Sequence, residues 1–121
     1  MTRTSTDPAA ILPLKHATYC VLLALADDEL HGYAIMQTVA QMTHGRQSIL
    51  PGTLYAALAR MVDEGLVEAR EGPAGDASGG PKRRYYRRTS FGRAVARAES
   101  ERLRALLAIA QSQNIVPGGR K

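Results

Sequence analysis

The chain has 121 residues, which is enough for one domain with short tails. It carries a formal charge of +5 and one cysteine, so an internal disulfide framework is excluded and an anionic partner is favoured. The amino-terminal residues lack the apolar segment of a signal peptide, and no apolar run approaches the length needed to cross a bilayer. These features favour a cytoplasmic protein without a membrane partner.

The first half of the chain predicts two helices behind a polar arm. Residues 1–13 are polar and contain two prolines, which favours a flexible arm. The apolar run LKHATYCVLLALA at 14–26 predicts a buried helix, and the acidic residues that follow, at 27–30, predict a turn. A second helix is expected over 31–43, where apolar residues recur at helical spacing.

A third helix is expected to begin at Pro51, because proline suits a first helical turn, and to end before Gly65. Its inward face is expected to hold Leu54, Leu58, Met61 and Val62. Its outward face is expected to hold small and polar residues: Thr53, Ala56, Ala59, Arg60 and Asp63, with Tyr55 on the flank. Small residues permit close approach to a DNA groove, and the donors beside them suit base edges and phosphates. A solvated helix face, with Arg60 paired to Asp63, is the alternative interpretation.

A basic hairpin is expected after this helix. Residues 66–71 and 82–89 predict two strands, joined by the Gly/Pro-rich loop 72–81. Alternation places one of the two tyrosines of the second strand inward. The candidate DNA contacts in this strand are Lys82, Arg83, Arg84 and Tyr86. An edge strand kept soluble by its charge is the alternative.

A long final helix is expected over 90–116, capped by Thr89, with 117–121 as a flexible tail. Its apolar stripe is too long for so small a domain to cover, which predicts a homodimer. The candidate dimer residues are Val95, Ala98, Leu103, Leu106, Leu107, Ile109 and Ala110. Arg102 interrupts the stripe and is expected to pair with an acid, either one such as Glu99 or one from the partner protomer. The alternative is a helix folded back on its own domain.

The fold class that follows is mainly α with a β-hairpin: a winged helix-turn-helix over 14–89 with a long C-terminal dimerisation helix. Three motifs in this order resemble the PadR family of winged-helix transcriptional regulators. They are LHGYAI at 30–35, PGTLYAALARMVDEGLV at 51–67 and GPKRRYYRRTSFG at 80–92. The resemblance covers about residues 14–110.

The resemblance implies a DNA-binding homodimer, usually a repressor, of the compact subgroup with a single dimerising helix. It implies that Gly32 and Tyr33 set the first DNA-facing helix and that Thr53 and Tyr55 lie at the DNA surface. The chain departs from the family at Arg88, where an apolar residue is usual, and at Phe91, where a polar one is common. The interpretation is that Phe91 takes over the packing and that Arg88 turns toward solvent or DNA.

By the same analogy a small-molecule effector is expected at the dimer interface. The candidate lining residues are Tyr19, Cys20, Leu23, Leu106 and Ala110. No cofactor or enzyme activity is expected, and no metal site, because the sequence has no CxxC or HxxxH cluster. The predicted function is a sequence-specific regulator on a palindromic operator in double-stranded DNA, a repressor released by its effector. The rival from another class is a winged helix that docks a protein.

Overall fold

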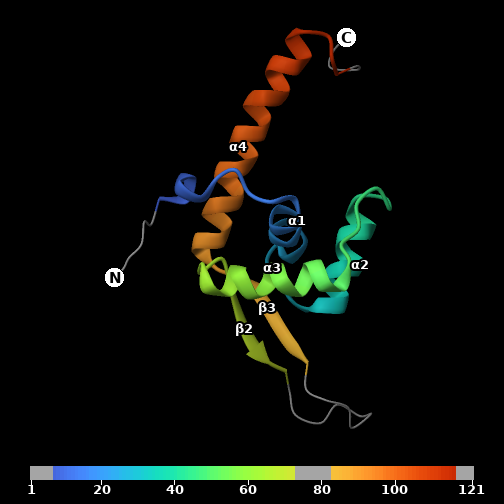
Figure 1. Cartoon of the computed structure of the whole chain (residues 1–121), viewed down its shortest axis with the longest axis vertical. Coiled ribbons are helices and arrows are strands. Elements are labelled where there is room, and N and C mark those ends of the chain that lie inside the picture. The colour runs from blue at the N-terminus through green and yellow to red at the C-terminus, as the bar shows by residue number, and fades with distance from the viewer. Residues whose placement is uncertain (1–6, 73–82, 117–121) are drawn as a thin grey trace.

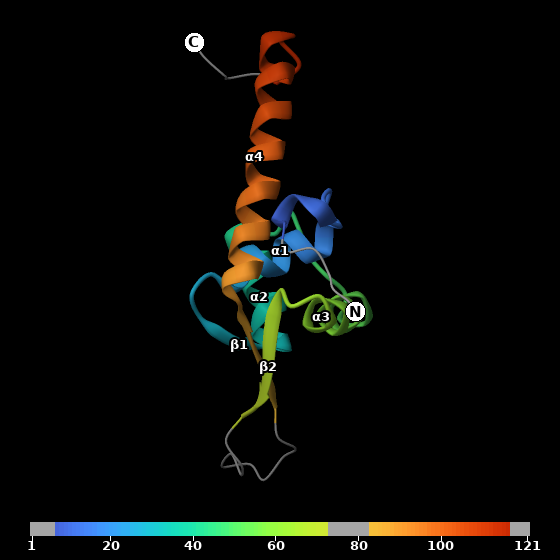
Figure 2. The ribbon, with the colours of Figure 1, turned by 90° about the vertical axis from the view of Figure 1, so that its left-hand side faces the viewer.

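A computed structural model of the chain describes residues 7–72 and 83–116. The described elements run in this order: η1 (Pro8–Ile11), α1 (His16–Leu25), β1 (Glu29–His31), α2 (Gly32–Met42), α3 (Pro51–Asp63), β2 (Val67–Glu71), β3 (Arg84–Arg88) and α4 (Ser90–Ser112). Helices α1, α2 and α3 pack together beside the sheet (Figure 1). Helix α4 extends from this body in one direction, and β2 and β3 extend in the other (Figure 2). The structure confirms the predicted winged helix-turn-helix with an added helix.

The sheet has three antiparallel strands in the order β1-β3-β2, so the wing is more than a hairpin. Strand β1 pairs with β3, with Glu29 opposite Arg87 and His31 opposite Tyr85. The turn predicted over 27–30 is present at 27–28, but residues 29–30 belong to β1 instead. Three residues are too few to display an alternating pattern, and their partner strand lies far along the chain. The pairing joins the start of α2 to the base of the wing.

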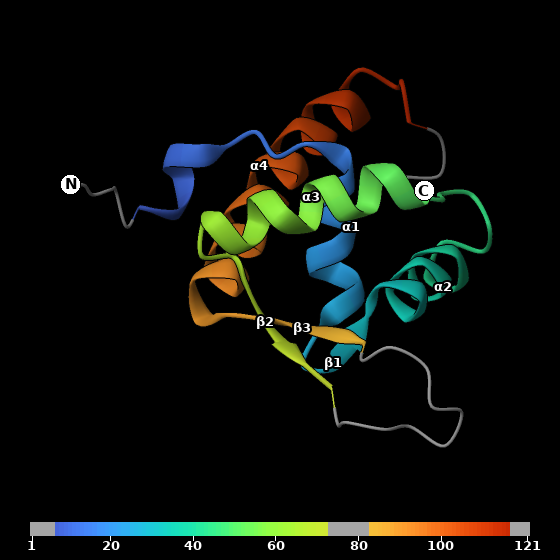
Figure 3. The ribbon, with the colours of Figure 1, turned by 60° about the horizontal axis from the view of Figure 1, so that its bottom comes forward.

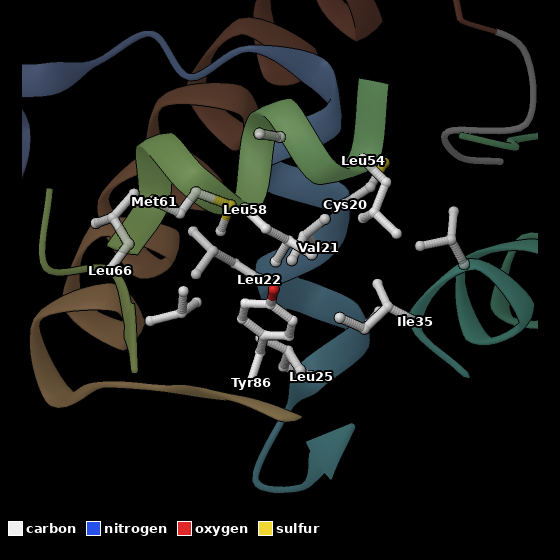
Figure 4. Close-up of a cluster of buried hydrophobic side chains, with 14 of the residues drawn as sticks. Cys20, Val21, Leu22, Leu25, Ile35, Leu54, Leu58, Met61, Leu66 and Tyr86 are labelled. Carbon is white, nitrogen blue, oxygen red and sulfur yellow. The ribbon is translucent and has the colours of Figure 1, made fainter. Parts of the chain in front are cut away.

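The core lies between α1, α3 and the inner face of the sheet (Figure 4). Leu54, Leu58 and Met61 of α3 are buried as predicted, but Val62 is 37% exposed and Ala57 is buried in its place. These two positions lie about 70° to either side of the apolar stripe, since each residue turns the helix by about 100°. The side of α3 that holds Ala57 is buried because α3 packs against α1. The helical pattern alone does not show whether Ala57 or Val62 is the buried residue.

The predicted caps on either side of the wing are present. Gly65 has a φ of 78°, and Leu66 N–H donates to the Met61 carbonyl across 2.9 Å, which ends α3. Thr89 Oγ accepts the Gly92 N–H across 2.9 Å and starts α4. Helix α4 ends at Ser112 rather than at 116. Two residues later, Asn114 adopts a φ of 61°. The structure does not describe 117–121.

The expected flexible arm is packed where the structure describes it. Residues Pro8–Ile11 form the 3₁₀ helix η1, which contacts α4. Ile11 and Leu14 pack against the core, and Leu14 N–H donates to Glu99 Oε2 across 3.3 Å. The arm prediction was therefore wrong from residue 8 onward, because these apolar side chains find a surface on α4. Its first six residues lie outside the described part of the chain.

Candidate nucleic-acid interface

Helix α3 presents the outward face that the sequence predicts. Thr53, Tyr55, Ala56 and Arg60 are all exposed, and Tyr55 is 48% exposed although it is aromatic. Figure 3 shows α3 crossing this side of the molecule, with the strands of the wing beside it. An exposed helix with small residues at its centre can approach another surface closely. This geometry suits a DNA major groove.

A hollow of about 380 Å³ lies between the start of α2, α3 and β3. Five of the predicted contacts line it, Tyr33, Tyr55, Arg83, Arg84 and Tyr86, together with His31 and Gly32. Tyr33 is 62% exposed and the two arginines are exposed. The hydroxyls and guanidinium groups in this hollow are hydrogen-bond donors, and none of the described residues that line it carries a carboxylate. An anion such as a phosphate suits this lining.

Gly32 lets α2 and α3 meet at this hollow. A methyl group at this position would lie 2.6 Å from Cζ and 2.8 Å from Cε1 of Tyr55, which is inside van der Waals contact. The tyrosine ring therefore lies directly against the start of α2. The absence of a side chain at Gly32 is what lets the Tyr55 ring come this close.

The prediction that Tyr86 contacts DNA was wrong. It is only 7% exposed and packs in the core beside Leu22 and Leu25 (Figure 4). Only its edge borders the hollow, so it is not free to reach DNA. Its neighbour Tyr85 faces the other side of β3, edge-on to His31 with ring centroids 5.5 Å apart. Alternation predicted one inward tyrosine, and the register with β2 decides which one.

His31 belongs to this site, although the sequence indicated only a helix start. Its Nδ1 accepts the Ala34 N–H across 3.2 Å and caps α2. Its Nε2 lies 3.0 Å from a terminal nitrogen of Arg83. Burial lowers the pKa of His31, and the charge of Arg83 lowers it further. The ring is thus neutral at neutral pH.

Arg60 lies apart from this group. It lines a separate hollow of about 130 Å³, whose other lining residues are Ile11, Pro13, Leu14, Lys15, Thr18 and Glu64. In the described part of the chain it forms no ion pair with Asp63. Lys82 and most of the predicted wing loop at 72–81 fall outside the described residues.

Arg88 points inward, contrary to the interpretation drawn from the sequence. Its side chain is 14% exposed and pairs with Asp27 across 3.6 Å. It also donates to the Leu22 carbonyl in the last turn of α1 across 3.0 Å. A cation at the C-terminus of a helix is favourable there. Phe91 does pack against the core, as expected.

The predicted dimer stripe divides into two parts. Val95 is fully buried in its own domain, so its assignment to the dimer surface was wrong. Leu103, Leu106, Leu107 and Ile109 are between 37% and 53% exposed and form an apolar face on the second half of α4. Ala98 and Ala110 are half-buried. As predicted, Arg102 pairs with Glu99, Nε to Oε1, across 2.7 Å.

The predicted effector residues do not share one environment. Cys20 is 5% exposed within the core, and burial raises the pKa of its thiol, so it does not line a surface pocket. Tyr19 Oη lies 2.7 Å from Ser100 Oγ of α4, which is a contact within the protomer. Leu23 and Leu106 are exposed. Their role in a ligand site remains a prediction.

The described residues lack two other features. No three His, Cys, Asp or Glu side chains there lie close enough to hold a metal ion together, although Cys20 Sγ lies 3.5 Å from His16 Nε2. None of the described helices combines the length and the apolar character of a membrane span.

Comparison with known proteins is consistent with this geometry. The transcriptional regulator PadR-like family matches residues 21–98. The uncharacterized protein X of Lysinibacillus sphaericus is 35% identical over 79 residues, which are 65% of this chain and 70% of that protein.

Two solved structures share the fold. A transcriptional regulator from Clostridium thermocellum aligns with a TM-score of 0.68 at 23% identity, over 80% of this chain and 88% of that one. Bacillus subtilis PadR in complex with operator DNA aligns with a TM-score of 0.59 at 22% identity, over 74% of this chain but 47% of that one. The match over most of the winged helix places this chain in the PadR-like family of transcriptional regulators.

Proposed function

We propose that the chain is a sequence-specific DNA-binding regulator that acts as a homodimer. The observation that carries the proposal is the exposed small and polar face of α3 beside a hollow lined by two arginines and two exposed tyrosines. Bacillus subtilis PadR, which shares the fold, has been solved with operator DNA. The net charge of +5 supports the same conclusion.

In this proposal α3 enters the major groove. Thr53, Ala56 and Arg60 then face the base edges, with Arg60 as the proposed donor to a guanine. Tyr33, Tyr55, Arg83 and Arg84 hold the phosphates beside the groove, which fixes the register without reading sequence.

The exposed apolar face of α4 supports a twofold dimer. Helix α4 has 23 residues and so spans about 34 Å, and its second half has no cover within the described protomer. A second copy of α4 and α1 would bury Leu106, Leu107 and Ile109. Two reading helices about 34–36 Å apart then predict a palindromic operator.

Repression and its release complete the proposal. The dimer occupies a promoter palindrome and blocks the polymerase. A small effector between α1 and α4 of the two protomers tilts the reading helices out of register and releases the DNA. The exposed Leu23 and Leu106 are the candidates for this contact.

Fluorescence anisotropy tests the proposal. The purified protein is titrated against a duplex from its own upstream region and against a scrambled duplex, at two salt concentrations. Tight binding to the upstream duplex at two protomers per site is expected, with a steep fall as salt rises.

An Arg83→Ala/Arg84→Ala variant sharpens the test. It should weaken binding to both duplexes and reduce the log–log salt slope by about 1.8, because each phosphate contact contributes about 0.9. The matched control is Arg97→Ala/Arg104→Ala, which removes the same charge from exposed positions of α4. DNA binding that does not respond to salt would instead support a winged helix that docks a protein. Separately, a monomer by light scattering at micromolar concentration would refute the proposed dimer.

A further inference from the structure

The contact between His31 and Arg83 contains a mismatch of hydrogen-bond donors. His31 Nδ1 accepts the Ala34 N–H, which is the side-chain cap of α2. A neutral imidazole has one N–H and one acceptor nitrogen, so Nε2 carries the hydrogen while the cap is in place. Arg83 has only donors, and its terminal nitrogen lies 3.0 Å from Nε2. Two N–H groups therefore converge on one point.

No protonation state of His31 removes this mismatch. The other neutral tautomer would offer Nε2 to Arg83 but would turn Nδ1–H against the Ala34 N–H. The protonated ring would donate at both nitrogens, lose the cap and add charge beside Arg83. Burial and Arg83 both lower the pKa of His31, which favours the neutral ring. The neutral ring with hydrogen on Nε2 keeps the helix cap and leaves the two donors without an acceptor.

Within residues 7–72 and 83–116, no oxygen accepts a hydrogen bond from either nitrogen. The described residues around this hollow are otherwise Gly32, Tyr33, Tyr55, Arg84 and Tyr86, and none of them has a carboxylate. The Tyr85 ring packs against His31 at an interplanar angle of 81°, with the ring centroids 5.5 Å apart. Arg83 Nη1 and His31 Nε2 are thus two adjacent donors on an open, cationic surface. A phosphate offers several strong acceptor oxygens within one group and so satisfies both donors together.

We propose that one DNA backbone phosphate bridges His31 Nε2–H and the Arg83 guanidinium, which makes His31 a binding residue of the interface. The inference rests on the proposed DNA-binding function and adds a residue and a ligand group to it. His31 ends β1 and caps α2, while Arg83 immediately precedes β3. The bridging phosphate therefore connects the start of α2 with the base of the wing and fixes the wing against the reading domain.

The variant that isolates His31 is His31→Asn. Asparagine is a favoured N-cap, so it keeps the bond to the Ala34 N–H, but its shorter side chain has no group at the position of Nε2. Unchanged helix content and a melting temperature close to that of the wild type would show that the cap is kept. Against the specific duplex this variant should bind about tenfold more weakly. Its salt slope should stay the same, because no charge has been removed.

A double-mutant cycle tests the shared phosphate. Arg83→Ala should lower both the affinity and the salt slope, the latter by about 0.9. If one phosphate joins the two residues, the double variant should bind clearly more tightly than the product of the two single losses predicts. The control cycle pairs His31→Asn with Arg87→Ala, because Arg87 lies within β3 and pairs with Glu68 across 2.8 Å. In that cycle the losses should multiply.

Independent losses of affinity in the His31–Arg83 cycle, or wild-type affinity of His31→Asn, would overturn this inference while leaving the proposed function intact. Failure of the wild-type protein to bind any duplex would overturn both. Nitrogen-15 NMR of the free protein adds a test without DNA, since it distinguishes the two neutral tautomers. The expected result is hydrogen on Nε2, and hydrogen on Nδ1 would refute the reasoning.

Discussion

Replacing Gly92 with alanine is expected to destabilise the joint between the wing and α4. The new methyl group would overlap the Leu66 carbonyl oxygen and lie 3.0 Å from its carbon. Carbon atoms in contact are about 3.5–4.0 Å apart, so the backbone has to move by about 0.5–1 Å. The Thr89 N–H donates to the same carbonyl across 3.1 Å, and this shift breaks that bond.

The cost follows from these two effects. Overpacking against the backbone costs about 1–3 kcal/mol, and the lost hydrogen bond adds about 1 kcal/mol. Reduced freedom of the unfolded chain offsets about 0.4–1 kcal/mol. A net loss of about 2 kcal/mol corresponds to a decrease in melting temperature of about 8 °C or more.

Thermal unfolding by circular dichroism measures this loss, at one protomer concentration for all variants. The matched control is Gly52→Ala, in the first turn of α3, where an added methyl group meets nothing within 4 Å. That variant should be slightly more stable than the wild type, because alanine suits a helix better than glycine. If Gly92→Ala melts at or above the wild-type temperature, the close approach to Leu66 is not a constraint.

Two further predictions concern the interface and the foot of α4. Gly32→Ala should displace the Tyr55 ring and so lower DNA affinity about as much as Tyr55→Ala does, while its melting temperature stays within a few degrees of the wild type. Fluorescence anisotropy and thermal unfolding measure these two quantities. Wild-type DNA affinity of Gly32→Ala would contradict the prediction. The hydrogen bond from Arg102 lowers the pKa of Glu99, so ionised Glu99 stabilises the fold at pH values above its unfolded-state pKa, which is near 4.5. This stabilisation is lost as the pH falls through the lower pKa of the folded state. The gap in melting temperature between wild type and Glu99→Gln should therefore narrow below about pH 4.5, and a gap independent of pH would refute this assignment.

Local signals account for the parts of the fold that the sequence predicted. The caps at Gly65 and Thr89 depend on residues within a few positions along the chain, and both are present. The inward face of α3 is similarly local, apart from its edge. The exposed polar face followed from the same helical period.

The errors share a dependence on contacts between distant segments. Strand β1 exists because β3 returns to pair with it, and Arg88 turns inward because the end of α1 offers a carbonyl there. Alternation in β3 could not decide between Tyr85 and Tyr86, since only the sheet register defines the inner side. The His31–Arg83 contact needed the same long-range pairing, so the sequence indicated a cap and not a binding residue.

The joint at Thr89 has a mechanical consequence for a dimer. Strand β3 ends at Arg88 and α4 begins at Ser90, so one residue separates them. Thr89 is held from both sides: its N–H donates to the Leu66 carbonyl and its hydroxyl donates to the Gly65 carbonyl across 2.6 Å, while its Oγ accepts the Gly92 N–H of α4. Because these bonds resist bending between β3 and α4, a rotation of α4 is passed on to β3. In a twofold dimer, a small rotation of the two α4 helices where they cross would therefore move each wing together with its helix. The crossing angle of the helices would then control the distance between the two wings.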